Sequence, residues 1–382
     1  MLLFEMFSRN ENIMQLLDSL QTQNFSKATN RLLDVLEDIV HKVEIKSDFS
    51  IRHPNYKPLE LPEAAVARFQ KIPEQMQQKY LNLQLCSLLY GIYYNGAMKT
   101  ALALGGERND LPLNLENNTV LGVDIGFYER LHESNCGEGY FDPSWSVLRK
   151  ETDGSLAVTK EGVRLHIERD KHLPPDQQAA KVGDAVAIRL PKNLVQNGFY
   201  MAVGNVRTNL LDDSKGDPVT VRVYFHLTSE GAVAVMGSLT QLLNEKAIPF
   251  SFKVLYNPKN YERYDSGVLY FDKRNYQVVR EVLQIVYRDE AHFKPDIPLF
   301  TKQLAPGLGL AEEPDQKFAE RESFGMNRCQ ILANGLLEAW HQGDDSPQGR
   351  IKAIYQQFSL LNIDLHRPYL NANSEDIYTL LS

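Results

Sequence analysis

Two segments of the sequence alternate so that polar side chains collect on one side of a predicted β-strand. In VTVRVYFHL, residues 219–227, one face is apolar and the other carries Arg222, Tyr224 and His226. In FSFKVLY, the same alternation places Lys253 on the face opposite the aromatic and valine side chains. If the two strands share a sheet and the orientation of their faces, His226 and Lys253 can lie side by side.

A histidine, a lysine and arginines on one face would form a cationic cluster in an acidic protein, and Arg263 in YERYDSGVLY would extend it from a turn. Such a cluster suits phosphate, because arginine offers a planar fork of donors and lysine a compact charge. Neighbouring positive charge lowers the pKa of a lysine in general, and a lysine base near neutral pH needs that. Histidine is a natural proton donor to a leaving group. Together these groups are suited to catalyse a β-elimination of phosphate.

The alternative is a solvated sheet face, on which Tyr, Arg and Lys are also common. His226 taken alone also fits a structural histidine. VRLHIE repeats the pattern with Arg164, His166 and Glu168, and we interpret it as surface. Pattern alone leaves both interpretations of the polar faces open.

The elements that would position these residues predict an α+β fold. Residues 1–115 form an N-terminal helical lobe, and residues 116–290 form a core around a central, mostly antiparallel sheet. Residues 291–382 add a loop and helices that complete the core. The strand-like segments are VLGVDIGFY, VRLHIE, AVAIRL, FYMAVGNV, VTVRVYFHL, FSFKVLY and GVLYF. Helices are expected in two pieces over 12–43, then at 63–94, at 229–246 with Ser229 as N-cap, and at 276–288, 327–341 and 348–358.

The composition and charge of the chain argue against several classes of protein function. The 382 residues carry 41 basic and 49 acidic side chains, and the net charge of −8 argues against nucleic-acid binding. The three cysteines, Cys86, Cys136 and Cys329, have no paired spacing, which is typical of a reducing compartment. We expect no secretory signal, no membrane span, no metal and no organic cofactor. The expected location is the cytoplasm, with export by a secretion machine left open.

Four segments carry a resemblance to a known family: VRVYFHLTSEGAVAVMGSLTQLLNEKAIPFSFKVLYNP, YERYDSGVLYF, FTKQLAPGLGLAEEP and ESFGMNRCQIL. In this order they resemble the HopA-type family of bacterial type III effectors and its cyanobacterial and peptide-biosynthesis relatives. More remotely, FH in one strand and FK in the next is similar to the phosphothreonine lyase effectors and to lyase components of lanthipeptide and thioamide-peptide synthesis. Those proteins eliminate phosphate from phosphothreonine or phosphoserine without a metal or organic cofactor.

The resemblance implies that Lys253 is the base for the α-proton, that His226 is the acid, and that Arg263 binds phosphate or the adjacent backbone. The lyase effectors carry a second lysine two positions before the histidine, where this chain has Tyr224. Arg222, two positions earlier on the same face, could substitute for it.

Further phosphate ligands are expected from the C-terminal part. Lys302 precedes a glycine-rich loop that could close over an anion, or the loop could be structural. Arg321 and Arg328 lie seven residues apart, so a helix would place them on one face. The family pattern suggests Arg328 as a phosphate ligand, whereas an arginine at a helix start is often solvated or ion-paired.

The function expected from these residues is a carbon–oxygen lyase that converts phosphoserine or phosphothreonine in a peptide or protein to a dehydroamino acid, for example in lanthipeptide-like maturation. Its partners would be the phosphorylated substrate and a kinase, with no nucleic acid and no membrane. A non-catalytic module that binds a phosphopeptide or a protein partner is the alternative. A third possibility is an acid–base enzyme acting on another phosphate ester through His226 and Lys253.

Overall fold

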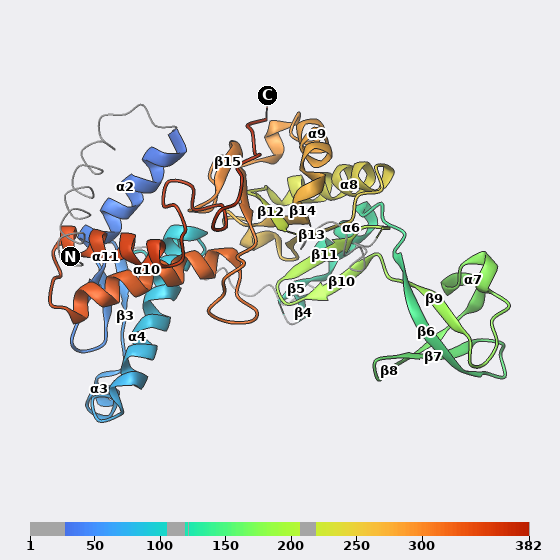
Figure 1. Ribbon diagram of the computed structural model, residues 1–382, viewed down its shortest axis with the longest axis horizontal. Helices are drawn as coiled ribbons and strands as arrows, with labels where there is room; N and C mark the ends of the chain where they lie inside the picture. The colour runs from blue at the N-terminus through green and yellow to red at the C-terminus, as the bar shows by residue number, and fades with distance from the viewer. Residues whose placement is uncertain (1–26, 105–118, 121, 207–218, 382) are drawn as a thin grey trace, which may run out of the picture. The chain divides into compact units, whose positions relative to one another are not determined.

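The computed structural model describes residues 27–104, 119–120, 122–206 and 219–381 (Figure 1). These residues belong to two compact units. The first comprises residues 1–110, 297–304 and 309–377, and the second comprises residues 111–296, 305–308 and 378–382. The helix expected near residue 13 and the boundary expected at 105–118 lie outside the described residues. The three-part division of the chain stays a prediction.

The second unit contains five strands of the central sheet. They are β10 (Asn193–Gln196), β11 (Phe199–Val203), β13 (Phe250–Leu255), β14 (Gly267–Asp272) and β12 (Thr220–Phe225), in that spatial order. Every pairing among them is antiparallel. The α+β class expected from the sequence is therefore confirmed. One expectation was wrong: β12 and β13 are not neighbours, because β14 lies between them.

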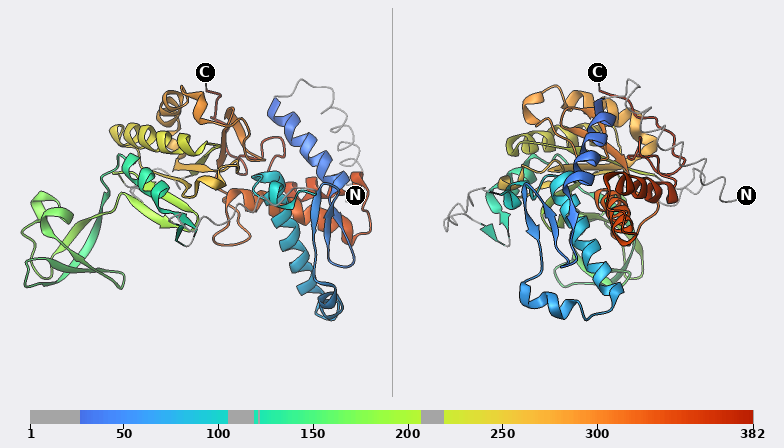
Figure 2. Two further views of the ribbon diagram at one scale, coloured as in Figure 1. Left: turned by 180° about the vertical axis from the view of Figure 1, so that it is seen from behind. Right: turned by 90° about the vertical axis from the view of Figure 1, so that its left-hand side faces the viewer.

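Helices cover the apolar face of this sheet, as Figure 1 shows for α8 (Ser229–Glu245) and α9 (Tyr276–Val286) and Figure 2 shows from behind. A third helix, α6 (Ile125–Ser134), contacts α8 and β11. The fully buried alternate side chains of the strands, such as Val223 and Phe252, form the core that these helices close. The polar residues of the same strands must therefore lie on the other face.

Two local expectations about helix starts need correction. The N-cap of α8 is Thr228 and not Ser229, since the Thr228 hydroxyl accepts the N–H of Gly231 at 2.9 Å. VLGVDIGFY is mostly not a strand: only the short β4 (Thr119–Val120) and β5 (Val123–Asp124) form before α6 begins. The Asp124 carboxylate caps α6 by accepting the N–H of Phe127 at 3.0 Å, which starts a helix where the alternation indicated a strand.

A second sheet in this unit has its own core. Its strands are β8 (Val163–Ile167), β7 (Leu156–Lys160), β6 (Tyr140–Lys150) and β9 (Ala185–Leu190), in that order and all antiparallel. Trp145, Val147, Val158 and Ile188 are among the side chains buried on one face. The short helix α7 (Arg169–His172) contacts β9. This sheet therefore has one apolar face and one face outside its core.

The first unit is mainly helical. Its elements are α2 (Lys27–Lys42), β1 (Glu44–Ile45), β2 (Ile51–His53), β3 (Tyr56–Leu59), α3 (Glu63–Phe69), α4 (Glu74–Leu88), a π-helical turn (Leu89–Tyr94), α5 (Lys99–Leu102), α10 (Phe324–His341) and α11 (Pro347–Leu360). Most residues of the strands β15 (Lys302–Ala305) and β16 (Leu308–Glu312) also belong to this unit. α10 and α11 approach closely at Gly335, where a Cβ would lie 2.6 Å from the Cα of Ile354. Among the described residues, no helix has the length and apolar character needed to cross a membrane.

Candidate functional site

The sheet register places the predicted polar residues on one face although β14 separates their strands. Tyr224, Val268 and Lys253 are aligned across β12, β14 and β13. Arg222 and Tyr270 are aligned in the neighbouring row of the same face. Adjacent strands are about 4.8 Å apart, so the backbones of Tyr224 and Lys253 are about 10 Å apart. The alternation therefore predicted the face correctly, and the inserted strand adds Tyr270 to it.

The Lys253 amine lies between aromatic rings. Its Nζ is 4.5 Å from the ring centre of Phe199 on β11 and 5.4 Å from that of Tyr270 on β14. The amide oxygen of Gln196 is 3.5 Å from Nζ, which is a long contact for a hydrogen bond. No carboxylate among the described residues pairs with this amine. The amine thus lacks the acidic partner that a structural lysine in a half-buried position usually has.

Two arginines adjoin the same two rings. The Arg222 guanidinium carbon lies 5.1 Å from the centre of the Tyr270 ring, and that of Arg263 lies 5.7 Å from the centre of the Phe199 ring. Lys253 and these arginines therefore share aromatic neighbours, as the sequence pattern predicted for one cationic face. Arg263 donates two N–H groups to the carboxylate of Asp265, at 2.9 and 3.0 Å. A phosphate that binds here must use other donors or displace Asp265.

His226 lies one residue beyond the end of β12 and is 3 % exposed. Its ring Nδ1 is 3.1 Å from the carbonyl oxygen of Asp296, and because a carbonyl only accepts, this contact assigns the proton to Nδ1. Nε2 is buried and has no hydrogen-bond partner among the described residues. The ring packs edge-on against Tyr264, with 5.2 Å between ring centres. The lone pair at Nε2 is therefore a buried acceptor that no described residue satisfies.

The loop between β13 and β14 connects the two candidate groups. Tyr264 contacts the imidazole of His226, and the preceding residue, Arg263, lies against Phe199, which contacts the Lys253 amine. These contacts run continuously from one group to the other within the second unit. Sequence reasoning missed Phe199, Tyr264 and Asp265; only the alternation in FYMAVGNV pointed to Phe199, since it places that residue opposite the buried Tyr200.

Burial lowers the pKa of His226, and the positive charge of Lys294 lowers it further. Lys294 is itself held by Glu262, with 2.6 Å between its amine and the carboxylate. The ring is therefore neutral near pH 7 in the free protein. A dianionic phosphate bound beside Nε2 would favour the protonated ring and convert it into an acid.

We expect an NMR titration of His226 to give a pKa below 6.5 in the free protein and a higher pKa in the presence of inorganic phosphate. The ring resonances of His341, which is exposed and belongs to the first unit, should not respond to phosphate. Because the unfolded chain binds this proton more readily than the folded chain, the stability that depends on His226 is present above pH 6.5 and is lost as the pH falls. An unchanged His226 titration in phosphate would contradict the anion site.

The remaining predicted ligands lie in the first unit. The Lys302 amine binds the Asp376 carboxylate at 2.8 and 2.9 Å. Arg321 is exposed and precedes α10. Arg328 is 1 % exposed and donates to the carbonyl oxygens of Pro368 and Leu370 at 2.7 and 3.0 Å. The described contacts of Lys302 and Arg328 are thus structural, and the assignment of these three residues to phosphate binding stays a prediction.

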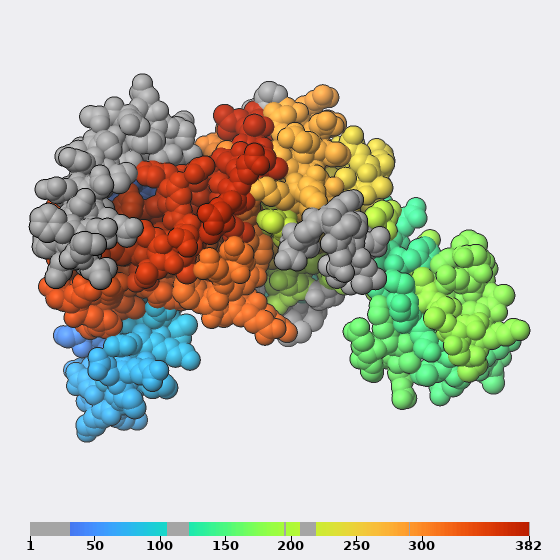
Figure 3. Space-filling model, viewed as in Figure 1, coloured from blue at the N-terminus to red at the C-terminus, as the bar shows by residue number. Residues whose placement is uncertain are grey.

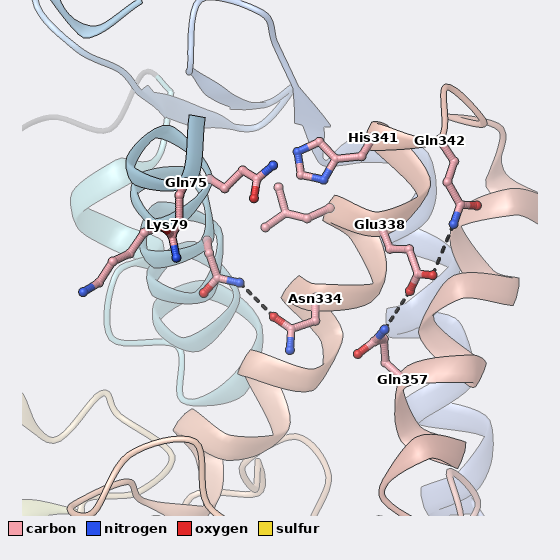
Figure 4. Close-up of a pocket in the computed structure, with 10 residues that line it drawn as sticks. Gln75, Lys79, Asn334, Glu338, His341, Gln342 and Gln357 are labelled. Carbon is pink, nitrogen blue, oxygen red and sulfur yellow. Dashed lines mark hydrogen bonds between the residues drawn. The ribbon is translucent and has the colours of Figure 1, made fainter. Parts of the chain in front are cut away.

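A second candidate site is an open hollow of about 570 Å³ in the first unit, lined by residues of α4, α10 and α11 (Figure 4). Carboxamides line much of it. Asn82 donates to Asn334 at 2.8 Å, and Gln357 donates to Glu338 at 2.6 Å. Figure 4 shows Lys79 and His341 on different helices around it. The hollow contains no residue that the sequence analysis put forward, and its amides offer hydrogen bonding without a paired acid and base.

The comparisons with known proteins bear on the sheet site. Residues 190–370 match the HopA1 effector protein family. The family resemblance expected from the sequence is confirmed. The HopA1-matching region contains all eight predicted site residues, from Arg222 to Arg328, and leaves out most of the second sheet.

Two solved effector structures from Pseudomonas syringae resemble the chain. The effector from pathovar tomato strain DC3000 has 18 % identity over 65 % of this chain and 81 % of its own, with a TM-score of 0.38. The effector from pathovar syringae strain 61 has 13 % identity over 92 % of this chain and 100 % of its own, with a TM-score of 0.43. No curated protein matches the chain. Residues 190–370 are thus similar to the HopA1 effector protein family, and activity is a separate question.

Proposed function

We propose that this protein, whose residues 190–370 match the HopA1 effector protein family, is a carbon–oxygen lyase that eliminates phosphate from phosphothreonine or phosphoserine in a peptide. The observation that carries the proposal is the Lys253 amine, which has no acidic partner among the described residues and shares its aromatic neighbours with Arg222 and Arg263. A half-buried amine in this setting is available to a substrate, and the arginines supply charge for a phosphate.

Lys253 and His226 carry out different proton transfers in the proposed reaction. The unprotonated Lys253 amine takes the Cα proton of the phosphorylated residue, and the electron pair of that C–H bond forms the Cα=Cβ double bond. The Cβ–O bond breaks, and its electrons leave with the phosphate. Arg222 and Arg263 stabilise the charge that develops on the leaving group and on the neighbouring carbonyl.

His226 would supply the proton that the departing phosphate needs. Its Nε2 is the ring atom without a partner, while Nδ1 is fixed by the Asp296 carbonyl oxygen. The neutral ring must first gain a proton at Nε2, and the negative phosphate favours that protonated form. His226 is therefore an acid only in the complex. The products are phosphate and a dehydroamino acid.

Incubation with a phosphothreonine peptide tests the proposal. Mass spectrometry should show loss of phosphoric acid, and a thiol should then add to the new double bond. Binding without a change in mass would favour a phosphopeptide-binding module. Release of phosphate with a regenerated hydroxyl group would favour a phosphatase that uses the same residues.

A further inference from the structure

The four-stranded sheet of the second unit ends at β8, a strand that has a neighbour on one side only. β8 pairs with β7, and no other described strand pairs with it. Figure 1 shows β8 at the outer edge of its sheet, and in Figure 3 the green residues of the β7–β8 hairpin reach the surface. Val163, at the start of β8, is 52 % exposed. An exposed edge of this kind can accept a further strand.

The hairpin geometry identifies the backbone groups that point outward. β7 and β8 are joined by the two-residue turn Glu161–Gly162, whose φ angles are 49° and 80°. In such a hairpin the residues flanking the turn exchange hydrogen bonds, and so does every second pair beyond them. Arg164 and His166 belong to the alternate pairs, opposite Thr159 and Ala157. Their N–H and C=O groups therefore face away from β7, toward the open edge.

The side chains of the same two residues lie on the sheet face opposite the core. Arg149, Ala157 and His166 are aligned in one row, and Ser146, Thr159 and Arg164 in the next. The face therefore presents the Arg164 guanidinium and the His166 imidazole beside β8 and carries small side chains farther in. Arg149 is 72 % exposed and pairs with Glu151 at the sheet margin. His166 contacts the Ser155 hydroxyl.

Arg164 is the strongest feature of this face. It is exposed, and none of the described residues forms an ion pair or hydrogen bond with its guanidinium group. Its outward backbone groups and its unpaired charge are both available to one ligand. A ligand that satisfies both must have a peptide backbone and a negative side chain.

We propose that the β8 edge binds an extended acidic peptide segment as an added strand. Residues of the incoming strand that pair with Arg164 and His166 project their side chains onto the same face as those two residues. Acidic side chains are therefore expected at every second position of the ligand. The proposal uses none of the residues of the proposed lyase site, so either can fail without the other.

A peptide fits this surface better than a nucleic acid does. The only aromatic side chain in the described rows of this face is Phe141, and the Arg189 guanidinium lies 5.0 Å from its ring centre. Bases would therefore find no open ring on which to stack. Backbone groups at a sheet edge match another peptide strand.

The test uses a fluorescein-labelled peptide in which Glu and Thr alternate, with binding to the full chain followed by fluorescence anisotropy. Arg164→Glu should weaken binding by at least about tenfold, because it replaces a charge-assisted contact with repulsion. Lys181→Glu makes the same charge change at an exposed position outside the strands and should alter the affinity less than about twofold. Circular dichroism of each variant checks that the fold is retained.

A second variant separates strand pairing from charge. His166→Pro removes an outward N–H without removing a bond of the β7–β8 ladder, so the sheet should persist while peptide binding weakens. The same peptide N-methylated at its Glu amides should also bind at least about tenfold more weakly, since those amides would pair with β8.

Five results would overturn the proposal. The Glu–Thr peptide could fail to bind, or Arg164→Glu could leave its binding unchanged. Equal binding of the N-methylated peptide would show attraction by charge alone. Finally, a single-stranded RNA probe that binds more tightly than the peptide, or a dimer that Arg164→Glu dissociates in analytical ultracentrifugation, would assign the edge to a different occupant.

Discussion

Replacing Lys253 by alanine should abolish the loss of phosphoric acid from a phosphothreonine peptide and leave the protein folded. The amine shares aromatic neighbours with both arginines and has no acidic partner among the described residues. Loss of a general base typically lowers a rate by about 10²–10⁴-fold. Its contacts to two aromatic rings are worth only about 0.5–2 kcal/mol, so the thermal midpoint should fall little. Single-turnover mass spectrometry measures the elimination.

Two further variants test whether the effect is specific to the Lys253 amine. Lys253→Arg keeps a cation between Phe199 and Tyr270 but provides no base, because a guanidinium stays protonated. It should still bind the phosphopeptide and should not eliminate phosphate. Lys259→Ala removes an exposed lysine from the turn that follows β13 and should react at the wild-type rate. Full elimination by Lys253→Arg would show that the amine is not the base and would leave only a binding role for this position.

The alternation of VTVRVYFHL and FSFKVLY fixed which side chains share a face, because strand residues have a strict period of two. It held no information about which strands are neighbours. β14 follows β13 in the chain and is inserted between β13 and β12, and only the hydrogen-bonded register reveals this order. The sequence therefore predicted the cationic face and misjudged the spacing of Lys253 and His226 across it.

The contacts of His226 could not be predicted from the sequence either, because they come from segments that are distant in the chain. Its Nδ1 partner is the carbonyl of Asp296, seventy residues later, and its ring neighbour is Tyr264 in the loop after β13. Neither contact follows from a local pattern. The unpartnered Nε2 and the lowered pKa come from burial, which depends on packing. Residue type suggested an acid, whereas burial in the folded protein lowers the pKa of the ring.

Where the observed strands and helices differ from the expected ones, local backbone conformation and helix capping explain the difference. In β6, Pro143 and the positive φ of 69° at Ser144 interrupt the alternation, so the strand over 140–150 was not expected. In VLGVDIGFY, the cap at Asp124 outweighs the apolar alternation and begins α6. The helices expected at 229–246, 276–288, 327–341 and 348–358 each formed as one helix, since their apolar spacing extends over three turns or more. The helix expected at 63–94 is instead divided into α3, α4 and a π-helical turn.

Arg328→Ala should destabilise the first unit strongly, by about 3–5 kcal/mol, whereas Arg321→Ala should change its stability by less than about 0.5 kcal/mol. The two arginines were expected on one helix face as phosphate ligands. Arg328 instead donates to the carbonyls of Pro368 and Leu370 and to the side chain of Asn327 from a buried position. Its removal leaves those oxygens buried without donors, and it also removes the contact of the guanidinium with the Phe324 ring, 5.0 Å from the ring centre.

Hydrogen exchange of the α10 amides measures this effect in the first unit directly, without assuming that the whole chain unfolds in one step. Faster exchange in Arg328→Ala and unchanged exchange in Arg321→Ala would establish Arg328 as a residue that ties α10 to the segment around Pro368. If Arg328→Ala instead retained wild-type exchange and lost only phosphopeptide binding, the carbonyl contacts would be dispensable and the family-based expectation of a phosphate ligand would gain support. The exposed Arg321 is a suitable control, because both variants remove the same charge and Arg321 lies only seven residues before Arg328.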